Sequence, residues 1–228
     1  MPPDPDHRAH EPADERAGEG DAQYFEHRPT VPSDPVVVDV SLPDTAFAME
    51  TDRGVFSRGH VDAGTAFLLR ADPPLVSHGH VLDLGCGAGV IALTMARRSP
   101  DATVWAVDVN ERARDLCRRN AERNAIANVR VAAPDDVPDD VSFGTIWSNP
   151  PIRIGKQALH DLLLRWLARL SCEGTAALVV QKHLGADSLQ RWLIDRGHPT
   201  ERIGSKAGFR LLAVRAATET DPDRTEAT

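Results

Sequence analysis

Residues 81–93 read Val-Leu-Asp-Leu-Gly-Cys-Gly-Ala-Gly-Val-Ile-Ala-Leu, and this stretch indicates the fold class. A short apolar strand pattern runs into Asp83, three glycines follow at positions 85, 87 and 89, and an apolar pattern of helical spacing comes next. Glycines permit a tight turn and a close approach of the backbone to a ligand. The spacing is G-x-G-x-G rather than the G-x-G-x-x-G of dinucleotide-binding enzymes, which disfavours a nicotinamide-dependent oxidoreductase.

The remainder of the chain alternates strand and helix patterns around this turn. Helices are expected at 63–71 (with Asp62 as its cap), 88–98, 110–124, 156–170 and 185–196, and strands at 80–84, 103–108, 128–132, 143–148, 174–181, 199–204 and 208–215. Such alternation predicts an α/β fold with a doubly wound, mostly parallel seven-stranded sheet. Two earlier strand patterns, 36–42 and 47–56, predict an N-terminal strand extension.

A second decisive run is Thr-Ile-Trp-Ser-Asn-Pro-Pro at 145–151. The strand must end at Asn149, because the two prolines that follow cannot donate to a sheet ladder and they hold the preceding residue in an extended conformation. Ligands of open α/β sheets bind at this carboxyl edge. The Asn149 amide oxygen and the Pro150 carbonyl offer two acceptors to one planar NH2 group. This arrangement suits group transfer to an exocyclic amine or amide.

A carboxylate, Asp108, ends the next strand pattern after the glycine loop. An acid at this position accepts hydrogen bonds from the ribose hydroxyls of a bound nucleoside. Asp83, Asp108 and Asp135 in one crevice would repel a pyrophosphate and favour a zwitterionic or cationic nucleoside.

Together these runs resemble the class I S-adenosylmethionine-dependent methyltransferases, with a Rossmann-like sheet. The glycine loop looks like their motif I, Asp108 like their ribose-binding acid, and Ser-Asn-Pro-Pro like motif IV of the enzymes that methylate amino groups. Residues 54–69, Gly-Val-Phe-Ser-Arg-Gly-His-Val-Asp-Ala-Gly-Thr-Ala-Phe-Leu-Leu, are similar to a segment of the small-domain family that modifies ribosomal RNA, typified by ribosomal RNA small-subunit methyltransferase C. That family makes N2-methylguanosine. The resemblance covers roughly residues 36–215.

The resemblance implies S-adenosylmethionine as cofactor and assigns roles to individual residues. The cofactor-binding set is Phe56, Ser57, Thr65, Asp83, Gly85, Cys86, Gly87, Gly89, Asp108, Val109, Asp135 and Asn149. The catalytic loop is Asn149, Pro150, Pro151 and Ile152, and the residues expected to contact substrate are Arg58, Arg153, Lys156 and Lys182. Phe56 has an alternative interpretation as a core side chain, and Asp135 as a loop acid. Asp83 is also expected to act in part as a structural acid that accepts hydrogen bonds from loop amides. The family usually has an aromatic residue, which stacks on the target base, where this chain has Ile152.

Charge is distributed unevenly along the chain. The net charge of −8 arises from residues 1–35, which carry −6, and residues 216–228, which carry −3, leaving +1 for the core. Residues 144–215 hold eleven basic and five acidic residues, among them all three lysines. We therefore expect disordered acidic tails at 1–34 and 216–228, a methyltransferase domain at 35–215, and an RNA-binding surface on the half that contains Asn149.

Composition excludes several other classes. The three cysteines, 86, 117 and 172, form no C-x-x-C pair, so neither zinc nor a disulfide framework is expected, and no metal is predicted. No apolar run approaches the length of a membrane span, and the acidic, proline-rich start does not resemble a targeting peptide, so a cytoplasmic location is expected. The expected partner is ribosomal RNA or the small ribosomal subunit. Adenine N6, a protein glutamine amide, and a non-catalytic RNA-binding role on the same fold remain as alternatives.

Overall fold

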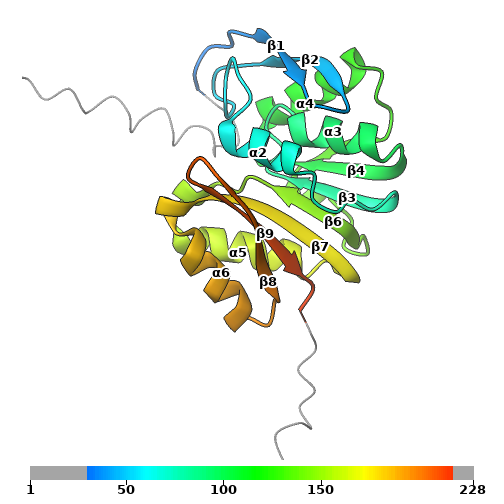
Figure 1. Ribbon diagram of the computed structural model, residues 1–228. Coiled ribbons are helices and arrows are strands. Elements are labelled where there is room, and N and C mark those ends of the chain that lie inside the picture. Colours follow the sequence, from blue (N-terminus) through cyan, green and yellow to red (C-terminus); the bar gives the residue numbers. More distant parts are fainter. Residues whose placement is uncertain (1–29, 218–228) are drawn as a thin grey trace, which may run out of the picture.

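Seven strands form one twisted sheet in the computed structural model, which describes residues 30–217 (Figure 1). Their order is β5-β4-β3-β6-β7-β9-β8. The bounds are β3 (His78–Leu84), β4 (Asp101–Val107), β5 (Val129–Ala132), β6 (Phe143–Ser148), β7 (Leu170–Gln181), β8 (Thr200–Lys206) and β9 (Phe209–Arg215). All neighbours from β5 to β7 run parallel, whereas β9 is antiparallel to both β7 and β8. The predicted doubly wound, mostly parallel seven-stranded sheet is confirmed.

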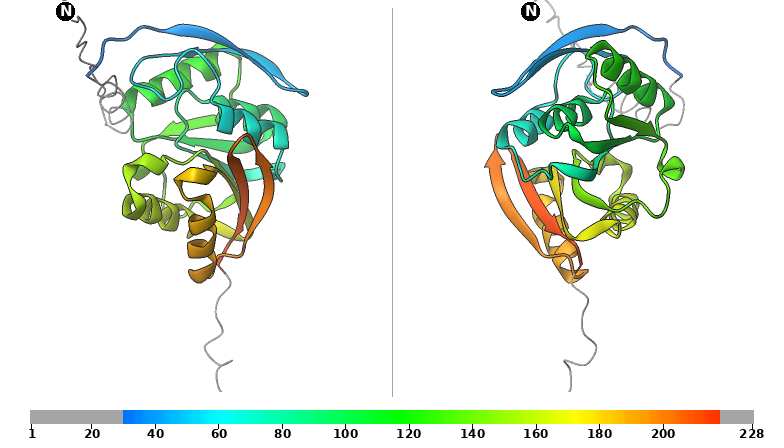
Figure 2. Two further views of the ribbon diagram at one scale, coloured as in Figure 1. Left: turned by 60° about the vertical axis from the view of Figure 1, so that its left-hand side comes forward. Right: turned by 90° about the vertical axis from the view of Figure 1, so that its right-hand side faces the viewer.

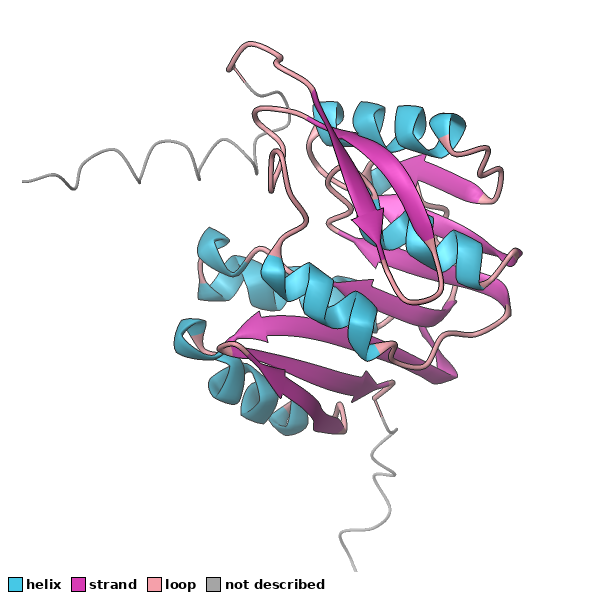
Figure 3. Cartoon of the chain, turned by 45° about the horizontal axis from the view of Figure 1, so that its top comes forward, coloured by secondary structure: helices cyan, strands magenta, loops and turns pink. Residues whose placement is uncertain are grey.

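Helices cover both faces of this sheet, as the cartoon in Figure 3 shows. One face carries α2 (Ala63–Ala71), α3 (Val90–Arg98) and α4 (Glu111–Arg123), and the other carries α5 (Lys156–Leu167) and α6 (Ala186–Asp195). Successive strand residues supply opposite faces, because side chains in a strand alternate. Val81 belongs to the core beneath α2, α3 and α4, and Leu82 to the core beneath α5 and α6.

The order of the strands places a crevice beside β3. From β3 the chain moves outward to β4 and β5, and it then returns to the opposite side of β3 to form β6 and β7. Leu84, the last residue of β3, pairs with Val107 of β4 and with Ser148 of β6, so three strands end together. The Ser148 hydroxyl donates to the Leu84 carbonyl at 2.7 Å and ties two of these ends to each other. Ligands bind at such a switch point in open α/β sheets.

An antiparallel hairpin, β1 (Val36–Ser41) and β2 (Ala46–Thr51), forms a separate sheet outside α4 and confirms the predicted strand extension (Figure 2). The fully buried Asn120 of α4 joins it to the domain. Its amide oxygen accepts from the Glu50 amide at 2.7 Å, and its amide nitrogen donates to the carbonyls of Glu50 at 2.8 Å and Ala88 at 2.9 Å. One side chain thus connects the hairpin, α4 and the glycine loop.

Two expected boundaries were wrong. The strand expected at 47–56 ends at Thr51, because the Asp52 side chain accepts from the backbone amides of Asp34 and Arg53 and the chain then turns through Gly54 with φ +74°. The helix expected at 156–170 ends at Leu167, and Leu170 already pairs with Phe143 in the sheet. Sheet pairing overrides a helical pattern there.

The predicted acidic tails lie almost wholly outside the described residues, and the boundaries of the predicted domain stay a prediction. Between residues 30 and 217, no helix combines the length and the apolar character needed to cross a membrane.

Gly89 is the glycine of the loop whose replacement is most restricted by packing. It begins α3 with φ +96°, and a Cβ added to it would lie 2.6 Å from the Cys117 sulfur of α4. The close contact between the loop and α4 therefore requires the absence of a side chain.

We predict that Gly89→Ala lowers the free energy of unfolding by about 2–4 kcal/mol, the sum of a left-handed backbone penalty and overpacking. Urea denaturation measures this change. Gly79→Ala is the matched control, because Gly79 has φ +79° but no atom within 4 Å of an added Cβ, so it should cost only the backbone penalty. Equal losses in the two variants would contradict the packing explanation, whereas Cys117→Ala should rescue part of the Gly89→Ala loss.

Candidate active site

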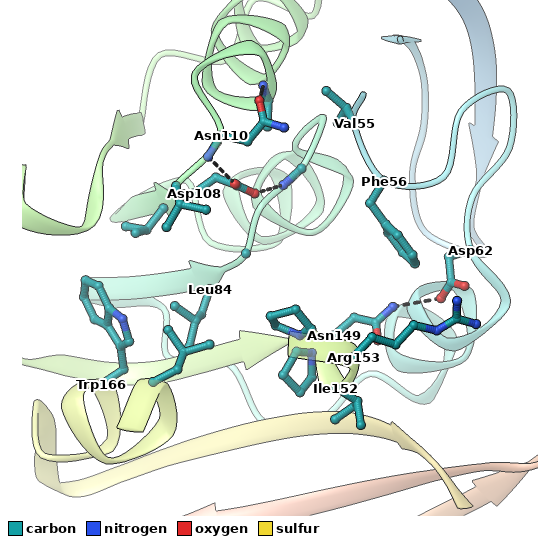
Figure 4. A pocket seen from close by; sticks show the side chains of 18 of the residues that line it. Val55, Phe56, Asp62, Leu84, Asp108, Asn110, Asn149, Ile152, Arg153 and Trp166 are labelled. Carbon is teal, nitrogen blue, oxygen red and sulfur yellow. Dashed lines mark hydrogen bonds between the residues drawn. The ribbon is translucent and has the colours of Figure 1, made fainter. Parts of the chain in front are cut away.

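A pocket of about 320 Å³ opens at the carboxyl ends of β3, β4 and β6 (Figure 4). One side is apolar and consists of Leu84, Val107, Val109, Ala113, Pro134, Leu162 and Trp166. The other side carries Asp62, Asn149 and the loop Pro150–Arg153. An apolar lining with a few polar groups is typical of a small-molecule or cofactor site.

Asp108 lies between the glycine loop and α4 on the pocket wall. One carboxylate oxygen accepts from the Gly87 amide at 2.9 Å and the other from the Asn110 amide at 2.9 Å (Figure 4). Burial raises the pKa of the Asp108 carboxyl, and the hydrogen bonds from the Asn110 and Gly87 amides oppose that rise. Each carboxylate oxygen has a further lone pair, so the side chain can still accept from a diol in the pocket.

Asp83 has a structural position beneath the glycine loop, in agreement with its alternative interpretation. It is fully buried and lines neither the main pocket nor the adjoining hollow, and one of its oxygens accepts from the Ala92 amide at 2.9 Å while the other has no hydrogen-bond partner within residues 30–217. Burial raises the pKa of Asp83 to about 8, and the nearby Asp108 adds to the rise. Its visible role is to hold the first turn of α3 under the glycine loop. Its predicted contact with the cofactor stays a prediction.

Asn149 is held by two side chains from the start of α2. Its amide nitrogen donates to the Asp62 carboxylate at 2.8 Å and to the Thr65 hydroxyl at 3.0 Å. The same Asp62 oxygen accepts from the Thr65 backbone amide at 2.9 Å, which confirms Asp62 as the cap of α2. A carboxylate only accepts, so the NH2 side of the amide must face Asp62. The amide oxygen of Asn149 is thereby left for the pocket.

The two prolines after Asn149 close a tight turn. The Pro150 carbonyl, predicted as the second acceptor for an amine, accepts from the Ile152 amide at 2.9 Å. A carbonyl has two lone pairs, so a second donor can still bind it. Pro150, Pro151 and Ile152 all line the pocket, and their catalytic role stays a prediction.

A smaller hollow of about 50 Å³ adjoins the main pocket beyond the glycine loop. The two share Phe56, Asp62, Gly85, Gly87 and Asn149. Ser57, Thr65 and Cys86, all predicted to bind the cofactor, line the hollow, and the buried Ser57 hydroxyl has no hydrogen-bond partner in the described structure. A buried hydroxyl without a partner is costly, and a polar ligand group would satisfy it.

These surroundings fit the parts of S-adenosylmethionine. The apolar side suits a purine, Asp108 suits a ribose diol, and the hollow with the Ser57 hydroxyl suits the polar amino-acid end. Glycines 85 and 87 lie between the two spaces and leave room for a ligand to pass.

Several predicted site residues lie elsewhere. Asp135 is largely exposed and forms an ion pair of 2.8 Å with Arg165, so its side chain is not part of the pocket wall that Pro134 contributes. Arg58 forms an ion pair with Asp34. Lys156 and Lys182 are exposed and do not line the pocket, whereas Arg153 does. Gly89 acts in packing, as described above, and Val109 lines the pocket.

Sequence reasoning missed two of the polar residues at the site. Asp62 was expected only as a helix cap, and its contact with Asn149 joins residues 87 positions apart. Asn110 lines the pocket, caps α4, and donates from its side chain to the Gly54 carbonyl at 2.7 Å. The position of Asn110, two residues after Asp108 and at the start of a helix pattern, was the signal in the sequence that could have identified it.

No cluster of three or more His, Cys, Asp or Glu side chains that could hold a metal ion occurs within residues 30–217.

Comparison with known proteins supplies the family. The model of the methyltransferase small domain matches residues 46–213, most of the chain. The chain belongs to the methyltransferase small domain family. This assignment confirms the predicted enzyme class, a methyltransferase, and the predicted cofactor, S-adenosylmethionine.

Individual relatives agree with the family assignment. YbxB of Bacillus subtilis is 33% identical over 84% of this chain and 97% of its own length. Ribosomal RNA small subunit methyltransferase C of Shewanella amazonensis is 35% identical over 64% of this chain, and that of Aeromonas hydrophila is 33% identical over 74%. The chain spans 43% and 49% of those two proteins.

Solved structures show the same fold. The T. thermophilus 16S rRNA N2 G1207 methyltransferase (RsmC), solved with AdoMet and guanosine, superimposes with a TM-score of 0.70 at 24% identity over 82% of this chain and 52% of that chain. A ribosomal protein L11 methylase from Lactobacillus delbrueckii has a TM-score of 0.59 at 20% identity over 70% of this chain and 81% of that chain.

We predict that Asp83→Asn changes how stability depends on pH. The folded pKa of Asp83 is about 8, well above that of an exposed aspartate, so the folded state holds a proton that the unfolded state releases. The free energy of unfolding should therefore fall as pH rises from about 4 to about 8, by an amount on the order of a few kcal/mol. The substituted amide keeps an oxygen that can accept from Ala92 and carries no charge, so the profile of this variant should be flatter. Denaturant unfolding across this range measures the effect, with exposed Asp101→Asn as control; parallel wild-type and Asp83→Asn profiles would contradict it.

Proposed function

We propose that this protein transfers the methyl group of S-adenosylmethionine to an exocyclic amino group, and that the acceptor is guanine N2 in 16S ribosomal RNA. The observation that carries the proposal is the orientation of Asn149. Both protons of its amide nitrogen are directed to Asp62 and Thr65, so a hydrogen-bond acceptor, and not a donor, faces the pocket. An acceptor beside the Pro150 carbonyl suits a planar NH2 group.

The chemistry requires alignment more than acid–base catalysis. The bound cofactor supplies a methyl group that is already electrophilic. Asn149 and Pro150 accept the two amine hydrogens, hold the nitrogen in place and direct its lone pair toward the methyl group. The apolar wall excludes water from the reacting atoms, and the amine proton leaves to solvent. No described residue needs to act as a general base.

Guanine N2 in RNA is favoured by the relatives and by charge. The two ribosomal RNA methyltransferases C share 33–35% identity with this chain over the part that they match. The net charge of +6 over residues 144–215 lies on the half that contributes Asn149, where phosphate groups would be attracted. A guanine must be unpaired or flipped out of its stack to reach Asn149. Such a substrate places the enzyme in the cytoplasm.

We predict that Asn149→Ala separates binding from chemistry. The cofactor should bind within several-fold of the wild type, because Asp108 and the glycine loop hold it, while methyl transfer should fall by roughly two orders of magnitude or more. Asp108→Ala is the complementary variant, and it should weaken cofactor binding severely. Calorimetry with S-adenosylhomocysteine and transfer of labelled methyl to small-subunit ribosomal RNA measure the two effects. Near-wild-type turnover in Asn149→Ala would reject its role, and label on protein or on adenine would reject the guanine acceptor.

We also predict that the basic half, and not the acidic tails, binds RNA. A chain trimmed to residues 35–215 should fold and bind RNA at least as tightly as the full chain.

Neutralising Arg153 and Lys156 by substitution with Gln should weaken RNA binding. It should also make the slope of log affinity against log salt concentration shallower by about two, one for each lost phosphate contact. Arg70→Gln, at the far end of α2, is the control and should change neither the affinity nor the slope. An unchanged slope in the Arg153/Lys156 variant would contradict RNA contacts at the pocket rim.

A further inference from the structure

One aromatic ring at the pocket is exposed. Phe56 is 50% exposed, while the pocket's other aromatic residues, Trp166 and Phe209, are buried. The other large hydrophobic residues exposed within residues 30–217 are aliphatic and line neither pocket. Leaving an apolar ring in water has a cost, and an exposed apolar side chain at a pocket indicates a binding surface.

The backbone on both sides of Phe56 is fixed, so its exposure does not come from a loose loop. Val55 is buried at 1% exposure, and the Gly54 carbonyl accepts from the Asn110 side chain at 2.7 Å. On the other side, the Gly59 amide donates to the Thr51 hydroxyl at 2.9 Å. Ser57 adopts a left-handed conformation, with φ +64°, which a non-glycine residue takes up only when its surroundings impose it. The chain therefore holds this ring at the mouth of the pocket.

Ile152 lies across Asn149 from Phe56. Figure 4 shows the Phe56 side chain directed toward Asn149 and Arg153, with Ile152 on the other side of Asn149. Pro150, Pro151 and Ile152 line the same pocket as Phe56, and Ile152 also packs against the core beneath α5 and α6. A flat substrate held by Asn149 would therefore lie between Phe56 and the loop that carries Ile152.

We propose that Phe56 is the stacking platform for the target base and takes the part that an aromatic residue after Pro151 would otherwise play. The inference rests on the proposed function, because it requires a planar acceptor at Asn149. An unpaired base loses its stacking partners when it enters a pocket, and an aromatic face replaces them. The competing role of Phe56 is the one that the family resemblance implies, a contact with the cofactor. Phe56 borders both spaces, so the two roles must be separated by experiment.

The variant Phe56→Leu separates base stacking from cofactor contact, because leucine still offers the cofactor an apolar surface but has no aromatic face. The substrate is the small ribosomal subunit, or its 16S RNA, from cells that lack the enzyme. We expect the KM for this RNA to rise by roughly 10- to 100-fold, the range for loss of one base stack, with the affinity for S-adenosylhomocysteine unchanged within about twofold. Phe56→Tyr should retain the wild-type KM. Ile194→Ala, a substitution of a similarly exposed apolar residue on α6, should change neither value.

An aromatic residue at position 152 gives a further test. In the Phe56→Leu background, Ile152→Phe should lower the KM at least part of the way back to the wild-type value, because a base held at Asn149 could then stack on the ring at position 152. An unchanged KM in Phe56→Leu, or a loss of cofactor affinity as large as the rise in KM, overturns the stacking role while leaving the proposed function intact. A wild-type enzyme that transfers no methyl to RNA overturns both.

Discussion

The hydrogen bonds from the Asn149 amide to Asp62 and Thr65 are the constraint on which the geometry of the site depends. They join the end of β6 to the start of α2, across the space where the glycine loop emerges from β3. Because Asp62 also caps α2 through the Thr65 amide, the start of the helix and the orientation of the Asn149 amide are both fixed by one carboxylate. If the Asn149 amide were reversed, its oxygen would face the Asp62 carboxylate. Both groups are hydrogen-bond acceptors, so no hydrogen bond could form between them. The pocket therefore presents an acceptor without any ligand being present to select it.

The acidic groups around the glycine loop divide into two kinds. Asp83 lies buried beneath the loop, with a pKa of about 8, and holds α3; it thus adds little negative charge below that pH. Asp108 lies at the pocket wall, where backbone amides bind both of its oxygens and oppose the effect of burial on its pKa. The Asp108 oxygens thus remain as hydrogen-bond acceptors where a ribose diol is expected. Because Asp83 is protonated below its pKa, the loop does not have to accommodate two buried negative charges, which would destabilise it.

The mouth of the pocket combines an apolar plane with positive charge. Phe56 borders it from the segment after β2, and Arg153 from the catalytic loop. The hairpin β1–β2 does not line this pocket, but its Val38, Met49 and Thr51 line the adjoining hollow, and Asn120 fastens it to α4 and to the Ala88 carbonyl of the glycine loop. The segment after β2 thus contributes Phe56 to the pocket, while the ends of the central strands contribute Leu84, Asp108 and Asn149.

The sequence by itself determined the fold class and the order of most elements, because these follow from local signals: alternating apolar periods, a glycine loop after a strand, and two prolines that end another strand at Asn149. The enzyme class and the cofactor followed from the resemblance of the glycine loop and the Ser-Asn-Pro-Pro run to the class I methyltransferases. The sequence also located helix α2 and its cap. It did not determine what Asp62 does beyond capping, since a contact between residues 87 positions apart depends on how β6 and α2 meet. Nor did it show that Asp83 lies buried away from the pocket, that Asp135 turns to Arg165, or that Arg58 pairs with Asp34. Those outcomes depend on which side of a loop faces the core and which charge of opposite sign lies within reach, and only the packed tertiary structure decides them.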